Sequence, residues 1–236
     1  MKRNPRWIIG VCIGACLTAV AAALHAWGAV EVRTNPAAIL CLTFIGALWM
    51  LVTFKIIPWL GLSFEFDIVD CKNTAAVIAF FGAVVAIAIL YACGNFGEGP
   101  SYLENFFSAG VGCVAWFLLW LIFEITTSVS LSITEQRDLA SGVRTCGLLV
   151  AMGLILGRAT AGNWASAFAT IHDLFRDGWV AGALVVLALP VESLVKPSKS
   201  RPFPSWISCG MVPAIIYLSI AGAWLWHLGR WEGMPQ

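Results

Sequence analysis

The stretch AAVIAFFGAVVAIAILYACG, residues 75–94, decides the fold class, because it is twenty residues long and carries no charge. A helix needs about 20 mainly apolar residues to cross roughly 30 Å of hydrocarbon. Backbone N–H and C=O groups find no water in that layer, so a run of this length is expected to be helical. The segment is therefore predicted to be a transmembrane helix.

Six other stretches have the same character, at approximately 7–29, 38–60, 106–128, 143–160, 179–195 and 206–228. The 236-residue chain is 60% hydrophobic and 11% charged, against roughly 45–50% and about 25% in soluble domains. This composition excludes a disordered chain, and a net charge of +1 argues against a nucleic-acid partner. We predict an all-α, polytopic membrane helix bundle of about seven transmembrane helices in a lipid bilayer. The sixth stretch is the shortest and contains Pro190, so it is expected to sit short or tilted.

The distribution of Lys and Arg predicts the orientation of the spans, because short cytoplasmic loops carry an excess of both residues. With the amino terminus inside, ten of these residues fall on the cytoplasmic side and four outside. The ten are Lys2, Arg3, Arg6, Lys55, Lys72, Arg137, Arg144, Lys196, Lys199 and Arg201, and the four are Arg33, Arg158, Arg176 and Arg230. The carboxyl terminus is then outside. The first stretch has features of a signal peptide, but its apolar run continues to Ala29, so we expect a retained helix.

The chain matches itself when it is shifted by 65 residues. Residues 70–76 then overlay residues 135–141, with acid on acid at Asp70 and Glu135 and base on base at Lys72 and Arg137. Each copy reads as a helix, a short cytoplasmic loop and a second helix, so the two copies have the same orientation. This repeat divides the chain into a first helix (1–37), two two-helix units (38–95 and 106–162) and a remainder (163–236).

The matched loops have a structural and a functional interpretation. Asn73 and Asp138 are good N-cap residues for the helices that follow, and Asp70 and Glu135 would favour the helix dipole. Ser132 and Glu135 also have capping-box spacing. Alternatively, the two loops meet at the cytoplasmic face and form one asymmetric polar site.

Residues 66–76 (FDIVDCKNTAA), followed by Ala79-Phe80-Phe81-Gly82, resemble the YjfL-like family of bacterial inner-membrane proteins, which is built on tandem copies of the domain of unknown function 350. The resemblance covers roughly 40–160. The second copy departs from the family pattern at Asp138-Leu139-Ala140-Ser141. The resemblance implies a bacterial inner membrane and a duplicated four-helix core, and it supplies no activity, substrate or catalytic residue.

Glu124 and Glu192 interrupt the fourth and sixth spans, about one turn from their cytoplasmic ends. Carboxylates inside a span are costly and are functional candidates by default, although residues this near the interface also serve structural roles. Lys55 is expected to anchor a span at the interface, or to pair with either Glu. The candidate polar cytoplasmic site comprises Asp70, Asn73, Glu124, Glu135, Asp138 and Glu192.

The outer segment 161–177 places Trp164, Phe168, Ile171 and Phe175 on one helical face. It predicts a separate short helix that lies on the outer leaflet or docks on the bundle or a partner.

No catalytic triad, phosphate loop or metal-ligand spacing occurs in the sequence, so no enzyme activity, cofactor or metal is expected. The expected function is a non-enzymatic accessory or scaffold subunit that packs against other membrane subunits or a second copy. The alternative is a transporter or channel whose cytoplasmic mouth the repeat loops form.

Overall fold

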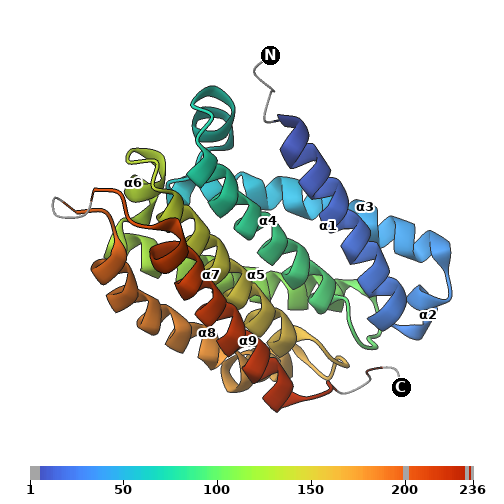
Figure 1. Cartoon of the computed structure of the whole chain (residues 1–236). Helices are drawn as coiled ribbons and strands as arrows, with labels where there is room; N and C mark the ends of the chain where they lie inside the picture. Colours follow the sequence, from blue (N-terminus) through green and yellow to red (C-terminus); the bar gives the residue numbers. More distant parts are fainter. Residues whose placement is uncertain (1–5, 199–201, 232–233, 235–236) are drawn as a thin grey trace.

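Figure 1 shows a bundle of long helices in a computed structural model that describes residues 6–198, 202–231 and 234. Seven helices are long and apolar enough to cross a membrane, which confirms the predicted all-α, polytopic bundle. They are α1 (Arg6–Trp27), α3 (Pro36–Phe54), α4 (Thr74–Gly94), α5 (Tyr102–Thr127), α7 (Leu139–Thr160), α8 (Ala167–Val195) and α9 (Val212–Leu228), the last extended at its start by η3 (Trp206–Met211). Lys2, Arg3, Lys199 and Arg201, which contribute to the predicted orientation, lie outside the described residues.

Helices α4 and α7 form the centre of the bundle, and glycines set how closely they approach. A Cβ atom on Gly82 would lie 2.6 Å from the Cα atom of Cys146, and one on Gly142 would lie 2.5 Å from the carbonyl oxygen of Ala75. Small residues at such contacts let two helix backbones pack directly against each other. The contacting residue numbers rise together along both helices, so α4 and α7 run in the same direction, as the predicted parallel repeat requires.

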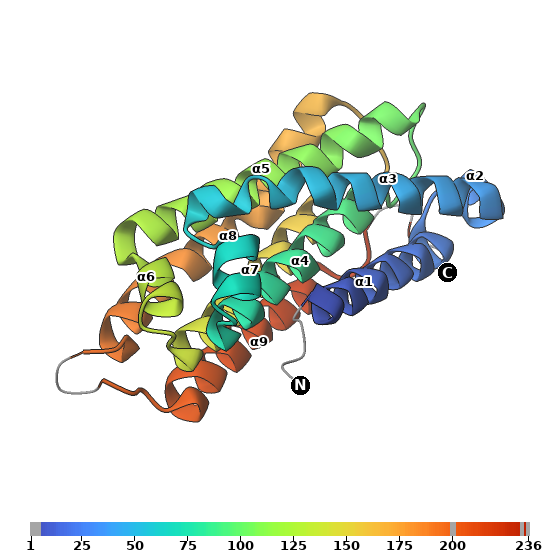
Figure 2. The same ribbon diagram turned by 90° about the horizontal axis from the view of Figure 1, so that it is seen from above.

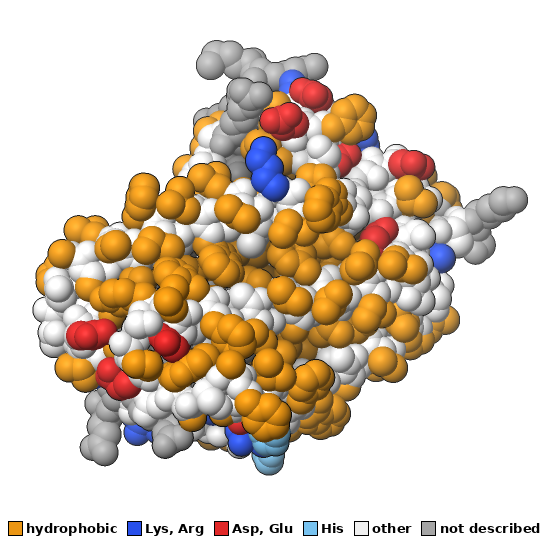
Figure 3. All heavy atoms as spheres, turned by 180° about the vertical axis from the view of Figure 1, so that it is seen from behind, with side chains coloured by type: hydrophobic (Ala, Val, Ile, Leu, Met, Phe, Trp, Pro, Cys, Tyr) orange, Lys and Arg blue, Asp and Glu red, His pale blue; other side chains and the backbone are white. Residues whose placement is uncertain are grey.

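The other long helices surround this central pair. Helix α1 packs on α4 and α9 packs on α7, while α5 contacts α4, α7 and α8. Figure 2 shows α3 and α5 on one side of the central pair and α1 and α9 on the other. Figure 3 shows hydrophobic side chains across the middle of one face, with charged side chains towards its edges. Leu40, Ile125 and Leu194 are each more than 70% exposed, as expected for side chains whose solvent is lipid.

The separate interfacial helix predicted over 161–177 is not present. Residues 167–177 are instead the first three turns of α8, which at 29 residues is the longest helix of the described chain. The apolar face of Ile171 and Phe175 therefore continues the membrane-facing surface of a span rather than lying flat on the leaflet. Pro190 lies inside α8 without ending it, so the sixth span is long rather than short.

The loops at the carboxyl-terminal ends of α4 and α7 are joined to each other. The Glu98 main-chain N–H donates to Asn163 Oδ1 at 2.9 Å, and the Trp164 N–H donates to the Glu98 carbonyl at 2.8 Å. Gly97 has φ +92° and lies so close to Gly162 that an added Cβ would be 2.3 Å from its carbonyl carbon. Only glycine satisfies both the conformation and the space. These contacts hold the two central helices together at the end opposite the polar loops.

Candidate functional site

The short loops before α4 and α7 have the same backbone geometry. Lys72 and Arg137 both lie in the left-handed region, with φ of 51° and 53°. The next residues, Asn73 and Asp138, are the N-caps, and their side chains accept hydrogen bonds from the second and third N–H groups that follow. The predicted capping role is therefore observed at both positions. The capping box predicted at Ser132 does not form, because Ser132 lies inside the short helix α6 (Val129–Thr134).

Asn73 also connects the two loops. Its Nδ2 donates to the carbonyl oxygen of Ile133 at 2.7 Å and to that of Thr134 at 3.2 Å. Both carbonyls lie at the carboxyl-terminal end of α6, where the helix leaves its last C=O groups without an internal partner. Asn73 is only 2% exposed, so its amide satisfies groups that water does not reach. The two loops therefore meet at one end of the bundle.

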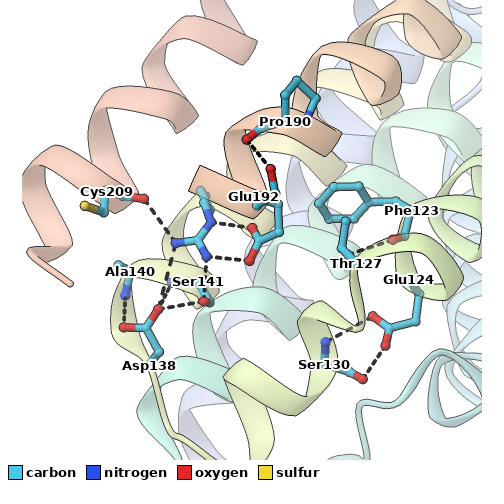
Figure 4. A network of polar contacts seen from close by, with 12 residues as sticks. Phe123, Glu124, Thr127, Ser130, Asp138, Ala140, Ser141, Pro190, Glu192 and Cys209 are labelled. Carbon is cyan, nitrogen blue, oxygen red and sulfur yellow. Dashed lines mark hydrogen bonds and ion pairs between the residues drawn. The ribbon is translucent and has the colours of Figure 1, made fainter. Parts of the chain in front are cut away.

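A buried ion-pair network lies next to the second loop, and Figure 4 shows it joining three helices. Arg144 of α7 donates from Nε and Nη2 to the two carboxylate oxygens of Glu192 in α8, at 2.5 and 2.6 Å. Its Nη2 also donates to Ser141 Oγ at 2.8 Å, and its Nη1 donates to the carbonyl of Cys209 at 3.1 Å. Ser141 Oγ in turn donates to Asp138 Oδ2 at 2.6 Å.

The network is closed to solvent and its strongest donors and acceptors are paired. Arg144 is 2% exposed and Glu192 is 1% exposed. Arg144 lies six residues beyond the N-cap, or about 9 Å along α7 at 1.5 Å per residue. A charge so far from water is tolerated only with a partner and with its remaining hydrogen bonds satisfied. The N-terminus of α7 favours the second negative charge, that of Asp138.

The hydrogen bonds of Arg144 limit the chemistry that this arrangement can carry out, because most of its N–H donors are already used. A guanidinium held by a bidentate carboxylate, a hydroxyl and a carbonyl has little left with which to bind a further group. In the described part of the chain, no group of three or more His, Cys, Asp and Glu side chains could hold a metal ion. The network is therefore suited to fastening α7, α8 and η3 together.

Glu124 is engaged separately, at the corner between α5 and α6. Its two carboxylate oxygens accept from Ser130 Oγ at 2.5 Å and from the Ser130 N–H at 3.0 Å. Ser128, with φ of 52°, makes the sharp turn between the two helices. Glu124 thus caps the start of α6 and fixes this corner.

The remaining predicted residues lie at the same end without joining the network. Asp70 and Glu135 are exposed on their loops. Lys55 is also exposed, and neither Glu pairs with it, because Glu192 binds Arg144 and Glu124 binds Ser130. Among the six candidates, the structure brings Asp138 and Glu192 together through Arg144 and leaves the others in distinct surroundings at one end of the bundle.

The sequence pattern predicts Arg144 to be a flanking charge at the end of a span, and in this respect the structure differs. The structure buries it inside α7. Two signals were available: Arg144 falls within the predicted fifth span, and Glu192 is an opposite charge within another span. Charged residues inside spans commonly pair with one another.

A family model described as Domain of Unknown Function (DUF350) matches residues 32–160, which includes both loops, Glu124 and Arg144 but not Glu192. No curated protein matches the chain. No solved structure matches it either.

Proposed function

The chain belongs to the family described as Domain of Unknown Function (DUF350), and from that premise we propose that it is a non-enzymatic scaffold subunit of a membrane assembly. We assign it to the bacterial inner membrane, with the polar loops and the amino terminus cytoplasmic. The charge distribution of the sequence and its resemblance to the YjfL-like proteins support this placement. The equivalent loops at Asn73 and Asp138 support two tandem copies of one unit.

The observation that carries the proposal is that the Glu192 carboxylate is buried and fully paired with Arg144. A carboxylate that lines a conduction path needs contact with water or a transported ion. Glu192 instead has both oxygens on Arg144 and is 1% exposed, and Glu124 is held by Ser130 at a separate corner. The carboxylates that would line the cytoplasmic entrance of a transport path, Glu192 and Glu124, therefore hold helices together, which favours a scaffold over a transporter.

A groove between α5 and α8 supplies a surface for a partner. Its volume is ≈ 650 Å³ and it lies in the outer half of both helices. Its walls include Gly110, Gly178 and Gly182, and a Cβ added to Gly182 would meet no atom within 4 Å. The open space at Gly182 would let a partner helix approach the backbone of α8 closely, which a packed helix exploits and a lipid chain does not need. We therefore assign the groove to one transmembrane helix of a partner subunit.

Site-specific photo-crosslinking tests this assignment in intact membranes. A photoreactive phenylalanine derivative replaces Val114, which lines the groove and is 59% exposed, and, as the matched control, Leu40 of α3, which is 71% exposed and outside it. The Val114 variant is expected to give one discrete adduct that the Leu40 variant lacks. Gly182→Leu should fill the groove and remove that adduct. An adduct of twice the chain mass would identify the partner as a second copy.

Two results would refute the scaffold. The first is the same crosslinking pattern from the Val114 and Leu40 variants, which would mean that lipid alone covers the groove. The second is ion flux through reconstituted vesicles that disappears in Glu192→Gln or Glu124→Gln. Such flux would show that these carboxylates line an ion-conducting path and do not only join helices.

A further inference from the structure

A second cavity, of ≈ 410 Å³, opens beside the carboxyl-terminal end of α3. It lies between α1, α3, the short helix η1 (Ile57–Leu60) and the start of η2 (Phe64–Asp70). Its lining is Ile13, Leu51, Phe54, Lys55, Pro58, Ser63, Phe64 and Glu65. These residues combine an apolar floor with a polar rim, which distinguishes this cavity from the apolar groove between α5 and α8.

The apolar floor is fixed by ring contacts with the core. Phe54 and Phe64 both pack on Phe80 of α4, with ring centroids 5.4 and 5.6 Å away. Phe80 is 2% exposed and lies in the close-packed core, so it supports the two lining rings from beneath. The floor therefore persists as a preformed surface for hydrocarbon.

The polar rim carries two opposite charges that are free to act. Lys55 and Glu65 are both exposed, and within the described residues neither side chain makes a hydrogen bond or an ion pair. Ser63 also lines the cavity, and its Oγ accepts from the Phe66 N–H at 3.3 Å. Its own O–H proton remains available for donation. The rim thus offers a cation, a hydroxyl donor and an anion.

The cavity lies at the level where lipid headgroups are found. Lys55 is the C-cap of α3, so it marks the end of that span. Trp59, four residues later, is 81% exposed, and indole rings concentrate at the membrane–water interface. A ligand with a polar head and a hydrocarbon chain would reach both the rim and the floor from the membrane.

We propose that this cavity binds a zwitterionic phospholipid whose headgroup carries a primary ammonium, such as phosphatidylethanolamine. Lys55 and Ser63 hold the phosphate, Glu65 holds the ammonium, and one acyl chain lies over Phe54 and Phe64. An anionic lipid meets repulsion from Glu65. A choline headgroup has the same charge but no N–H to donate to the carboxylate, so it binds less well.

Native mass spectrometry of the full chain in detergent tests the site, with dioleoyl phosphatidylethanolamine and dioleoyl phosphatidylcholine as the probes. The wild-type chain is expected to retain one ethanolamine lipid in preference to the choline lipid. Glu65→Gln should abolish that preference and weaken ethanolamine-lipid binding about two- to fivefold, the scale of a partly exposed ion pair. Lys55→Met should weaken binding of both lipids.

Matched variants separate this site from general surface charge. Glu135→Gln and Lys196→Met remove exposed charges at the same end of the bundle and should leave the preference unchanged. Leu51→Trp fills the apolar floor and should lower retention of both lipids while the chain still elutes as one species. An unchanged preference in Glu65→Gln, an equal loss in Glu135→Gln, or stronger retention of dioleoyl phosphatidylglycerol would overturn the proposal.

Discussion

The two polar loops of this protein share one backbone and differ in charge. Asn73 and Asp138 cap their helices in the same way, and the residues before them have the same left-handed φ. In the first unit the positions that follow on the helix are Ala76 and Ala79, both buried and apolar. In the second loop the corresponding positions are Ser141 and Arg144. The Ser141 hydroxyl accepts a hydrogen bond from Arg144, and Arg144 pairs with Glu192.

At or near each loop, a buried side-chain donor reaches backbone carbonyls of a segment that is distant in the sequence. The Asn73 amide reaches the carbonyls of Ile133 and Thr134, and the Arg144 guanidinium reaches that of Cys209. A neutral amide needs no counter-ion, whereas a buried guanidinium does, and Glu192 supplies it. The comparison shows that two loops with the same backbone geometry are joined to neighbouring segments by different chemistry.

Arg144→Met should give the largest effect. It leaves the carboxylates of Glu192 and Asp138 buried without a cation, so the free energy of unfolding should fall by about 3–5 kcal/mol. SDS titration in mixed micelles measures this change. The control is Arg137→Met, which removes the same residue type from an exposed position on the loop and should change stability by less than about 0.5 kcal/mol.

The double variant Arg144→Met/Glu192→Met sharpens the test, because it removes both charges and leaves apolar side chains. It should recover a substantial part of the loss, since an apolar pair of similar volume often replaces a buried ion pair without cost. If the double variant is as unstable as Arg144→Met alone, the loss of stability does not come from leaving the Glu192 charge unpaired. If Arg137→Met matches Arg144→Met, burial of Arg144 is wrong.

Gly82→Leu tests the close contact between α4 and α7. It should lower the free energy of unfolding by about 3 kcal/mol, because the new Cβ would lie 2.6 Å from the Cys146 backbone. The same titration measures it. Gly14→Leu in α1 is the matched control, since a Cβ there meets nothing within 4 Å. Equal stability of the two variants would contradict the close parallel packing of α4 and α7.

Sequence reasoning predicted the fold well and the site in part, for physical reasons. Span positions follow from apolar runs of membrane length, and the capping roles of Asn73 and Asp138 follow from local hydrogen bonding. The partner of Glu192 depends on how three helices pack, which no local pattern encodes. The sequence does not reveal the continuity of α8, because its first turns are amphipathic like an interfacial helix, while their apolar face continues the lipid-facing side of the span.

Exchanging the two caps should destabilise each loop by a moderate amount. Asn73→Asp keeps the cap but turns an oxygen towards the carbonyls of Ile133 and Thr134, and the loss should be about 1–3 kcal/mol. Asp138→Asn replaces one of two accepting oxygens and should cost about 1 kcal/mol through Ser141. Both changes are read by SDS titration. If either variant kept the wild-type stability, the two caps would be chemically interchangeable, and the difference in charge between the loops would have no energetic consequence.

The smallest effect is expected at the residues with left-handed backbone, and it should be stabilising. Lys72 and Arg137 are exposed, with φ near +50°, a conformation that costs an L-residue roughly 1–2 kcal/mol. Lys72→Gly and Arg137→Gly remove that cost, while the added freedom of the unfolded chain offsets about 0.4–1 kcal/mol of it. Each variant should therefore gain about 0.5 kcal/mol by SDS titration, and the two gains should be equal. Gly in place of exposed Glu135, whose φ is −83°, is the control and should not stabilise. Unequal gains would show that the two loops share residue types without sharing a backbone.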